Sequence, residues 1–243
     1  MTTHSIQYRE TSARLTCLPR YRDLAMETLH ETHARLCDYI SRDRKFFNSF
    51  APVDCRPGSP RIARHMAAAA RRAGTGPMSA VAGAIGLEVV RELVRAGANH
   101  VIFENGGDIT MYLGYAVTVG IYCGPNGPGE LGLRLEPRNR ITACCTSSGT
   151  VGHSFSYGLG DAAVVLADDP ILADATATAL GNRLRRGGAR SLAAALKNTP
   201  QRGIRTMIVA MNGKVAYRGD APAWVKTRTF LPPKIQEVHH ASA

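Results

Sequence analysis

The sequence predicts an α+β fold in which strands paired through short turns pack with helices. Two β-compatible runs open the chain on either side of Thr11-Ser12, and Asn212-Gly213 marks a two-residue hairpin near its end. Amphipathic and alanine-rich helical segments lie between them. Hydrophobic residues make up 44% and charged residues 20% of the 243 residues, which allows a packed core. The chain has no internal repeat, so we expect residues 1–243 to form a single domain.

The first half of the chain is predicted to contain a strand pair and then three helices. The strands cover residues 6–10 and 13–17, on either side of a polar turn. Helical periodicity and start signals, among them Ser59-Pro60, indicate helices over about residues 23–42, 59–73 and 79–95. Residues 46–59 contain prolines and a glycine and are predicted to be a loop.

The second half is predicted to be rich in strands. Runs of β-compatible residues cover 100–103, 109–113, 116–123, 131–135, 141–146, 162–166, 204–211 and 214–217. Two further helices are expected at about residues 169–184 and 191–197. Residues 124–129 are typical of a surface loop, and the tail after residue 232 is expected to be poorly ordered.

The charge balance favours an anionic partner. The formal net charge is +11, which suits a nucleotide, a phosphate or a carboxylate. Aromatic residues are only 6% and do not alternate with the basic runs, which argues against nucleic acid. No stretch approaches the roughly 20 apolar residues that span a bilayer. Residues 1–5 do not resemble a signal peptide, so we expect a cytoplasmic protein with no membrane partner.

The six cysteines are expected to be free thiols, since none forms a Cys-x-x-Cys motif and no export signal is present. Cys144 and Cys145 are adjacent in a strand-like run, where successive side chains face opposite ways. Two ordinary buried thiols are the simpler interpretation of this pair. A redox or sulfur-carrier site is the alternative.

Gly76-Pro77-Met78-Ser79 is the first candidate site segment, and it lies between two predicted helices. Glycine permits close backbone approach, and the following helix N-terminus offers free N–H groups to a phosphate or carboxylate. The segment lacks the pattern of a dinucleotide fingerprint or a P-loop. A tight turn between helices explains it equally well.

Asn105-Gly106-Gly107-Asp108 is the second candidate. Two glycines after a buried strand let the backbone pass close to a ligand, and Asp108 can accept a hydrogen bond from that ligand. A plain hairpin turn is the competing interpretation.

The third candidate is the hydroxyl-rich run around Ser148-Gly149-Thr150 and His153. The hydroxyls and backbone donors suit an anionic ligand, and His153 can act as a ligand contact or as a general acid or base. A histidine that only makes structural hydrogen bonds is the alternative.

Asp174 and Thr178 are the fourth candidate. They are four residues apart on a predicted helix and therefore share one face. A carboxylate with a hydroxyl suits Mg²⁺ or Ca²⁺, with waters and phosphate oxygens completing the shell. A polar stripe on a solvated helix is the competing interpretation.

Taken in order, these four segments resemble the ApbE superfamily, and more narrowly its short, largely uncharacterised ApbE-like branch, over roughly residues 5–220. ApbE proteins are flavin transferases that bind FAD, use Mg²⁺ and move FMN onto a threonine or serine of a target protein. The resemblance implies a fold of layered antiparallel sheets with packed helices. It implies a metal at Asp174 and Thr178, a nucleotide cleft at Gly106, Gly107 and Asp108, and a flavin-loop role for His153.

One segment departs from the transferase pattern. The transferases carry a lysine-glycine-tyrosine stretch that ends in an aspartate on an early helix. The corresponding run here, residues 82–87, has neither lysine nor aspartate. The resemblance therefore implies the fold and a cofactor cleft, and it leaves open whether the chain transfers FMN.

Three functions are consistent with these features. The leading hypothesis is a protein of cofactor or flavoprotein metabolism that binds FAD, FMN or another phosphate-bearing cofactor with Mg²⁺, with His153 and Asp174 as its catalytic candidates. The second is a sulfur-metabolism protein that uses cysteines near the cleft. The third is a non-catalytic binding or assembly subunit with a vestigial site. A protein partner and a homo-oligomer are both compatible with these hypotheses.

Overall fold

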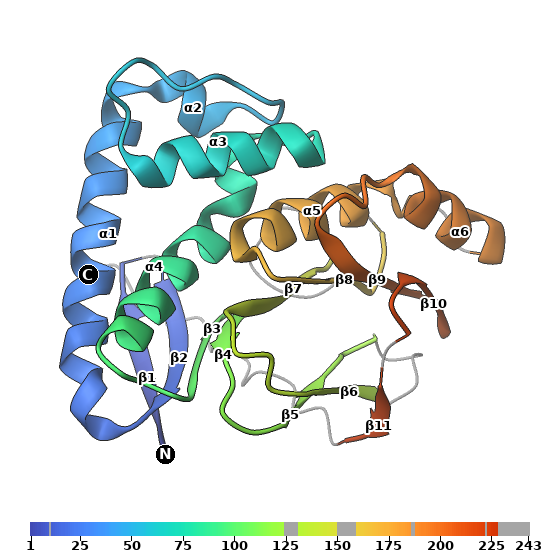
Figure 1. The fold of residues 1–243 in the computed structure, drawn as a ribbon. Coiled ribbons are helices and arrows are strands. Elements are labelled where there is room, and N and C mark those ends of the chain that lie inside the picture. The colour runs from blue at the N-terminus through green and yellow to red at the C-terminus, as the bar shows by residue number, and fades with distance from the viewer. Residues whose placement is uncertain (10, 124–130, 150–158, 186–187, 222, 228–243) are drawn as a thin grey trace, which may run out of the picture.

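The computed structural model describes residues 1–9, 11–123, 131–149, 159–185, 188–221 and 223–227. It has an α+β architecture of two antiparallel sheets with packed helices, as expected (Figure 1). The larger sheet has eight strands in the order β1-β2-β3-β4-β7-β8-β9-β10. Strands β1 and β10 form the two edges of this sheet. A smaller sheet has the order β11-β6-β5.

The strands of the two sheets are short and joined mostly by turns. The large sheet contains β1 (Thr2–Tyr8), β2 (Thr11–Cys17), β3 (Val101–Asn105), β4 (Asp108–Tyr112), β7 (Thr142–Ser147), β8 (Ala162–Ala167), β9 (Ile204–Met211) and β10 (Lys214–Gly219). The small sheet contains β5 (Val117–Gly120), β6 (Leu131–Leu135) and β11 (Trp224–Lys226).

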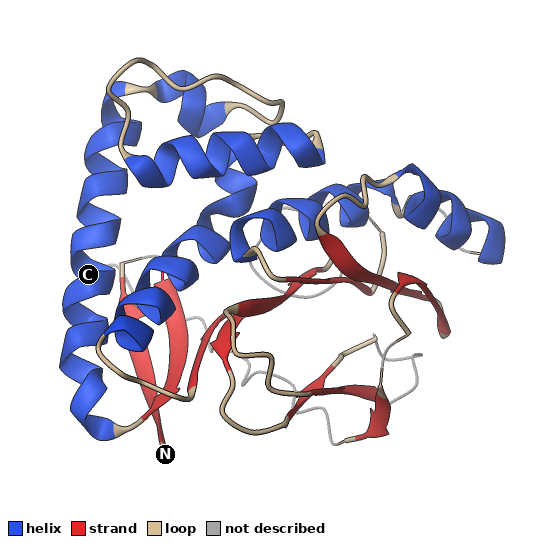
Figure 2. Ribbon diagram, in the orientation of Figure 1, coloured by secondary structure: helices blue, strands red, loops and turns tan. Residues whose placement is uncertain are grey.

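The helices lie together on one side of the large sheet, and the small sheet lies on the other (Figure 2). The α-helices are α1 (Arg22–Arg42), α2 (Arg44–Asn48), α3 (Arg61–Ala73), α4 (Val81–Arg95), α5 (Pro170–Arg183) and α6 (Ala189–Asn198). Two short 3₁₀ helices, η1 (Pro19–Tyr21) and η2 (Pro77–Ala80), precede α1 and α4.

Three apolar clusters fill the space between these layers. One joins α3, α5 and α6 to β7, β8 and β9 and is rich in alanine, which lets the elements approach closely. The second packs α1 and α4 against β1, β2 and β3. The third lies between the large and small sheets. Helix α5 sits in the middle of the first cluster, and its apolar side chains are almost all buried.

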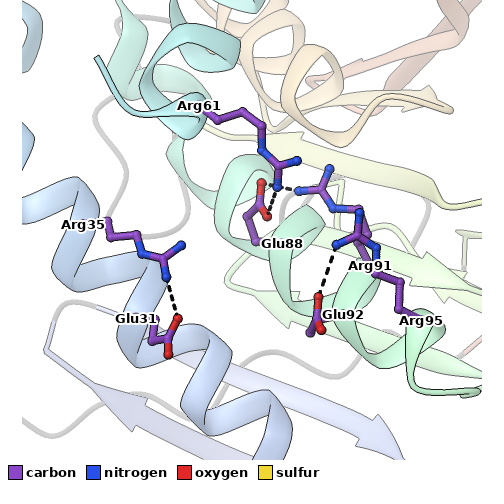
Figure 3. Close-up of polar contacts among 7 residues, drawn as sticks. All are labelled: Glu31, Arg35, Arg61, Glu88, Arg91, Glu92 and Arg95. Atoms are coloured by element: carbon purple, nitrogen blue, oxygen red, sulfur yellow. Dashed lines mark hydrogen bonds and ion pairs between the residues drawn. The ribbon is translucent and has the colours of Figure 1, made fainter. Parts of the chain in front are cut away.

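An ion pair connects α4 to α3, and further pairs lie along α4 itself (Figure 3). Glu88 pairs with Arg61 of α3 at 2.9 Å and also with Arg91 one turn further along α4. Glu88 is only 17% exposed, so its ion pair with Arg61 contributes more to stability than the more exposed ion pairs on the same surface. These contacts help to orient α4, whose first turn contacts Asp174 of α5.

The predicted elements occur in the observed order, but several of their details differ. The predicted turn at Thr11-Ser12 is wrong, because Thr11 pairs with Tyr8 and both residues of that dipeptide belong to β2. Strand β1 covers Thr2–Tyr8 instead of residues 6–10, and the short helix η1 was not predicted. The prediction of a loop over residues 46–59 is wrong at its start, because α2 ends at Asn48 and buries Phe46. Asp43 caps this helix by accepting from the backbone N–H of Phe46, a local signal that the prolines further on obscured. The three-residue strand β11 was not predicted.

Two further predictions concern membrane-spanning helices and the segments expected to be a loop or a tail. Within the described residues, no single helix is long and apolar enough to span a membrane; α3 and the η2–α4 segment meet that test only together, bent by 102°. The predicted loop at 124–129 and the tail after residue 232 lie outside the described residues.

Candidate functional site

Asp108 is the first residue of β4 and follows directly from a hairpin turn. Asn105 pairs with Asp108 across this turn, and Gly106 adopts a left-handed φ of 64°. A Cβ on Gly107 would lie 2.8 Å from the carbonyl oxygen of Thr146 in β7. The glycines therefore serve the hairpin and its contact with the neighbouring strand, and Asp108 is placed opposite Cys145 of β7.

Asp108 is half-buried as a residue, and the Oδ1 atom of its carboxyl group is fully buried. Its Oδ1 has no hydrogen-bond partner within the described residues. Burial raises the pKa of Asp108 to about 7, although the thiol of Cys145 and the backbone of Thr146 both act to lower it. An orphaned buried acceptor of this kind is costly, and a bound cation or proton relieves the cost.

Asp174 lies in the middle of α5 and is 7% exposed. Its Oδ2 accepts a hydrogen bond of 2.8 Å from the backbone N–H of Gly83 in the first turn of α4. Burial raises the pKa of Asp174 well above its usual range, and the charge of Asp108 raises it further. The backbone N–H groups of Gly83 and Ala82 act in the opposite direction. Asp174 thus serves as a cap for α4, supplied from another helix.

The small residues at the start of α4 permit this contact. A Cβ on Gly83 would overlap the carbonyl oxygen of Pro170 in α5. A Cβ on Gly86 would lie 2.6 Å from the hydroxyl oxygen of Thr110 in β4. Close packing of α4 against α5 and β4 therefore accounts for glycine at both positions. The same run is where the sequence departs from the flavin transferase pattern.

The structure brings Asp108, Cys145 and Asp174 into one buried cluster. The carboxyl groups of Asp108 and Asp174 raise the pKa of the Cys145 thiol, together with its burial, and burial is the larger cause. The sequence placed Cys123, Cys144 and Cys145 near the site segments but did not single out Cys145 as the neighbour of the two carboxyl groups. The signal was available in principle, because alternation in β7 makes Cys144 and Cys145 face opposite sides of the sheet.

The donors of this cluster are compatible with a divalent cation only in part. Two buried carboxyl groups that repel each other, with one oxygen unpartnered, are a setting that a cation stabilises. However, no group of three or more His, Cys, Asp or Glu side chains within the described ranges is arranged to hold a metal ion. A cation here would need further oxygen ligands, such as the half-buried Thr178 one turn along α5, water or a ligand phosphate.

Gly76, Pro77, Met78 and Ser79 form the turn that leads into α4. Pro77 is buried, and the Ser79 hydroxyl donates to the carbonyl oxygen of Gly76. A Cβ on Gly76 would overlap the carbonyl oxygen of Ser49, so packing against the chain itself explains this glycine. The sequence predicted that N–H groups at the start of α4 would receive an external anion, and one of them, that of Gly83, donates to the carboxyl group of Asp174.

The hydroxyl-rich loop is described only at its start. Ser148 is half-buried at the end of β7, and the backbone N–H of Gly149 donates to the carbonyl oxygen of Gly160 at 3.1 Å. Thr150 and His153 lie outside the described residues. The predicted roles of these two residues therefore stay predictions.

The vicinal cysteines behave as strand geometry requires. Cys144 packs into the cluster between the two sheets, whereas Cys145 packs into the cluster beneath α5. Burial raises the pKa of Cys144 to about 12, with a contribution from Asp108. Both are free thiols, as expected, and in this environment both are poor nucleophiles.

Comparison with known proteins places the chain among ApbE-like sequences. A family model described as AbpE bacteria matches residues 6–216. A UPF0280 protein from Methanocella arvoryzae is 40% identical over 227 residues, covering 92% of this chain and 91% of its own length. A UPF0280 protein from Methanosarcina acetivorans is 41% identical over 218 residues, covering 89% and 86%.

Two solved structures share the fold at low sequence identity. The apo form of the flavinyl transferase ApbE from Pseudomonas stutzeri is similar with a TM-score of 0.57 and 14% identity, covering 93% of this chain and 94% of the other. The ApbE protein of Thermotoga maritima gives a TM-score of 0.54 and 13% identity, covering 90% and 97%.

Proposed function

The chain belongs to the family described as AbpE bacteria, and on that basis we propose that it binds a flavin nucleotide or a related phosphate-bearing cofactor in flavin-related cofactor metabolism. The observation that carries the proposal is the buried pair of Asp108 and Asp174. These two carboxyl groups come from β4 and α5, elements far apart in the sequence, and meet beneath the start of α4.

The electrostatics of this pair support a cation as part of the site. Each carboxyl group is desolvated, and the charge of Asp108 raises the pKa of Asp174 further. A divalent cation would stabilise both in their charged forms and would attract the phosphate oxygens of a nucleotide. When bound, Mg²⁺ would supply charge neutralisation at the phosphate groups.

The residues of the chain would then have distinct tasks. Asp108 offers a carboxyl oxygen that no described residue uses. One carboxyl oxygen of Asp174 accepts from the N–H of Gly83. Asp174 would therefore cap α4 and contact the proposed cation at the same time. Thr178 follows one turn later on α5 and would supply a hydroxyl oxygen. Binding is the proposal; transfer of FMN to a protein would be a further step.

Isothermal titration calorimetry with FAD and FMN, in the presence of Mg²⁺ and of a chelator, tests the proposal. The expected result is Mg²⁺-dependent binding to the parent protein. Asp108→Asn should weaken that binding by about tenfold, the size of one lost charge-assisted contact. Absence of binding to either nucleotide in both conditions would overturn the flavin proposal.

The dual role of Asp174 needs a pair of variants. Asp174→Asn keeps an amide oxygen that can accept from Gly83, so it should fold normally and lose only the Mg²⁺ dependence. Asp174→Ala removes the acceptor and should also lower stability. Asp23→Asn is the matched control, since the Asp23 side chain is 93% exposed and pairs only with Arg22 among the described residues. It should bind like the parent.

The sulfur-metabolism hypothesis has weaker physical support. Cys123, Cys144 and Cys145 are all buried, and burial raises the pKa of each. The expected cytoplasmic location, a protein partner and homo-oligomerisation stay predictions.

A further inference from the structure

A hollow lies on the far side of α5 from the carboxylate pair. It has a volume of about 510 Å³ and is lined by Arg72, Leu172, Thr176, Pro200 and Arg202. That volume falls within the roughly 300–1,000 Å³ typical of small-molecule sites. Leu172 and Thr176 are one turn apart on α5, whereas Asp174 lies between them in sequence, about 200° around the helix from each. The hollow is therefore separate from the candidate site.

One wall of the hollow carries an ordered guanidinium group. Arg72, near the end of α3, donates to the carbonyl oxygen of Arg202 at 2.8 Å. Gly203 has a left-handed φ of 82°, and a Cβ there would lie 2.6 Å from Arg72 Nη2. Glycine at this position lets the backbone pass beside the guanidinium, which is held in place before any ligand arrives.

The charge of the hollow is positive. Asp169 Oδ2 lies 4.0 Å from Arg72 Nη1, while Asp169 Oδ1 accepts from the N–H groups of Ile171 and Leu172 as the cap of α5. Arg202 is exposed and forms no ion pair with a described residue. The two guanidinium groups outnumber the single carboxylate, so the hollow carries a net positive charge that would attract an anion.

Thr176 contributes a hydroxyl group to the lining. Its residue is only 1% exposed and belongs to the face of α5 that lines the hollow. A ligand oxygen in the hollow would accept a hydrogen bond from this hydroxyl. Leu172 and Pro200 complete the lining with apolar surface.

We propose that this hollow binds a small organic anion, with its phosphate or carboxylate group between Arg72 and Arg202. The head group would accept from the Thr176 hydroxyl, and the apolar part of the molecule would lie against Leu172 and Pro200. The fork of an arginine side chain matches both head groups, so the two chemistries are separated by experiment.

Calorimetric titration with phenyl phosphate, benzoate and inorganic phosphate tests this site. The expected result is that one aromatic anion binds and that inorganic phosphate binds more weakly, because it leaves the apolar lining uncovered. The tighter of phenyl phosphate and benzoate identifies the head group. If neither aromatic anion binds, or if inorganic phosphate binds as tightly, the proposed site is wrong.

Single substitutions locate the binding. Arg202→Gln should weaken it by about tenfold, and Thr176→Val, which preserves shape, should weaken it several-fold. Arg190→Gln removes the same charge at an exposed position outside the hollow and should have no effect. Asp174→Asn should also have none, which separates this site from the proposed cofactor site. Equal weakening by Arg202→Gln and Arg190→Gln would indicate only general attraction to a basic protein and would overturn the proposal.

Discussion

The carboxylate of Asp174 in α5 accepts a hydrogen bond of 2.8 Å from the backbone N–H of Gly83 in α4, 91 residues away in the chain. This single contact joins the two helices over the large sheet. It also places a carboxyl oxygen at the N-terminus of α4, where backbone N–H groups have no partner within the helix. The second buried carboxyl group, Asp108, approaches the same place from the sheet.

The contact at Gly83 predicts a strong intolerance of side chains. Gly83→Ala would force a methyl group against the carbonyl oxygen of Pro170 and separate α4 from α5. We expect a loss of about 1–3 kcal/mol in the free energy of unfolding, measured by urea titration. Ala68→Ser, at an exposed position of α3, is the control and should change stability little. Equal stability of the two variants would show that the helices are not closely packed here.

The raised pKa values predict a pH-dependent stability. The pKa of Asp108 is about 7 in the folded state, against an ordinary value of 3.8, and that of Asp174 is also raised. The folded state therefore holds protons that the unfolded state has released. This contribution is fully present below about pH 4 and is lost as the pH rises through 7.

Thermal or urea unfolding between pH 5 and pH 8 measures this effect. Without divalent cations, stability should fall toward pH 8 by up to about 1.4 kcal/mol per pH unit for each such proton. Asp108→Asn should show a smaller fall, and the comparison cancels the opposite contribution of His100, whose pKa burial lowers. The same slope in both proteins would contradict the burial of the pair.

The burial of the thiols predicts the order of their modification. Cys37 and Cys55 are partly exposed, whereas Cys17, Cys123, Cys144 and Cys145 are buried. Iodoacetamide should therefore alkylate the first two in the native protein, with Cys55 slowed because burial raises its pKa. Peptide mass spectrometry gives the order. Rapid alkylation of Cys144 or Cys145 would contradict this environment and would favour the sulfur-metabolism hypothesis.

Two threonines of α5 allow a matched pair of variants that tests the proposed metal site. Thr178 lies one turn from Asp174, whereas Thr176 lies on the opposite side of the helix. Thr178→Val should reduce the stabilisation that Mg²⁺ gives in a thermal unfolding assay, and Thr176→Val should leave it unchanged. If the two variants respond alike, Thr178 takes no part in holding the cation.

Most of the secondary structure follows from local sequence signals, because turns and caps act over a few residues. Asn212-Gly213 marks its hairpin, and alternation in β7 separates Cys144 from Cys145. Helix α2 was missed because its cap residue, Asp43, directly follows a longer helix. The short β11 depends on pairing with β6, which no local pattern indicates.

The site was predictable only in its parts. The motif containing Asp108 and the pair Asp174/Thr178 could be selected as candidates, but a plain hairpin competed with the first. Their meeting depends on the order of strands in the sheet and on the small residues of α4. The bond from Gly83 to Asp174 links segments whose contact no spacing rule gives, so the anion that satisfies α4 could not be foreseen as the chain's own carboxylate.

The central claim is that Asp108 and Asp174 hold a cation that also binds a nucleotide phosphate. The most direct test is calorimetric titration of FAD into the protein at increasing Mg²⁺ concentration, with Asp108→Asn alongside. In the parent, affinity for FAD should rise with Mg²⁺, because cation and phosphate stabilise each other in the site; in Asp108→Asn this dependence should largely disappear. FAD affinity that is independent of Mg²⁺ in the parent, or equally dependent on it in both proteins, would contradict the claim.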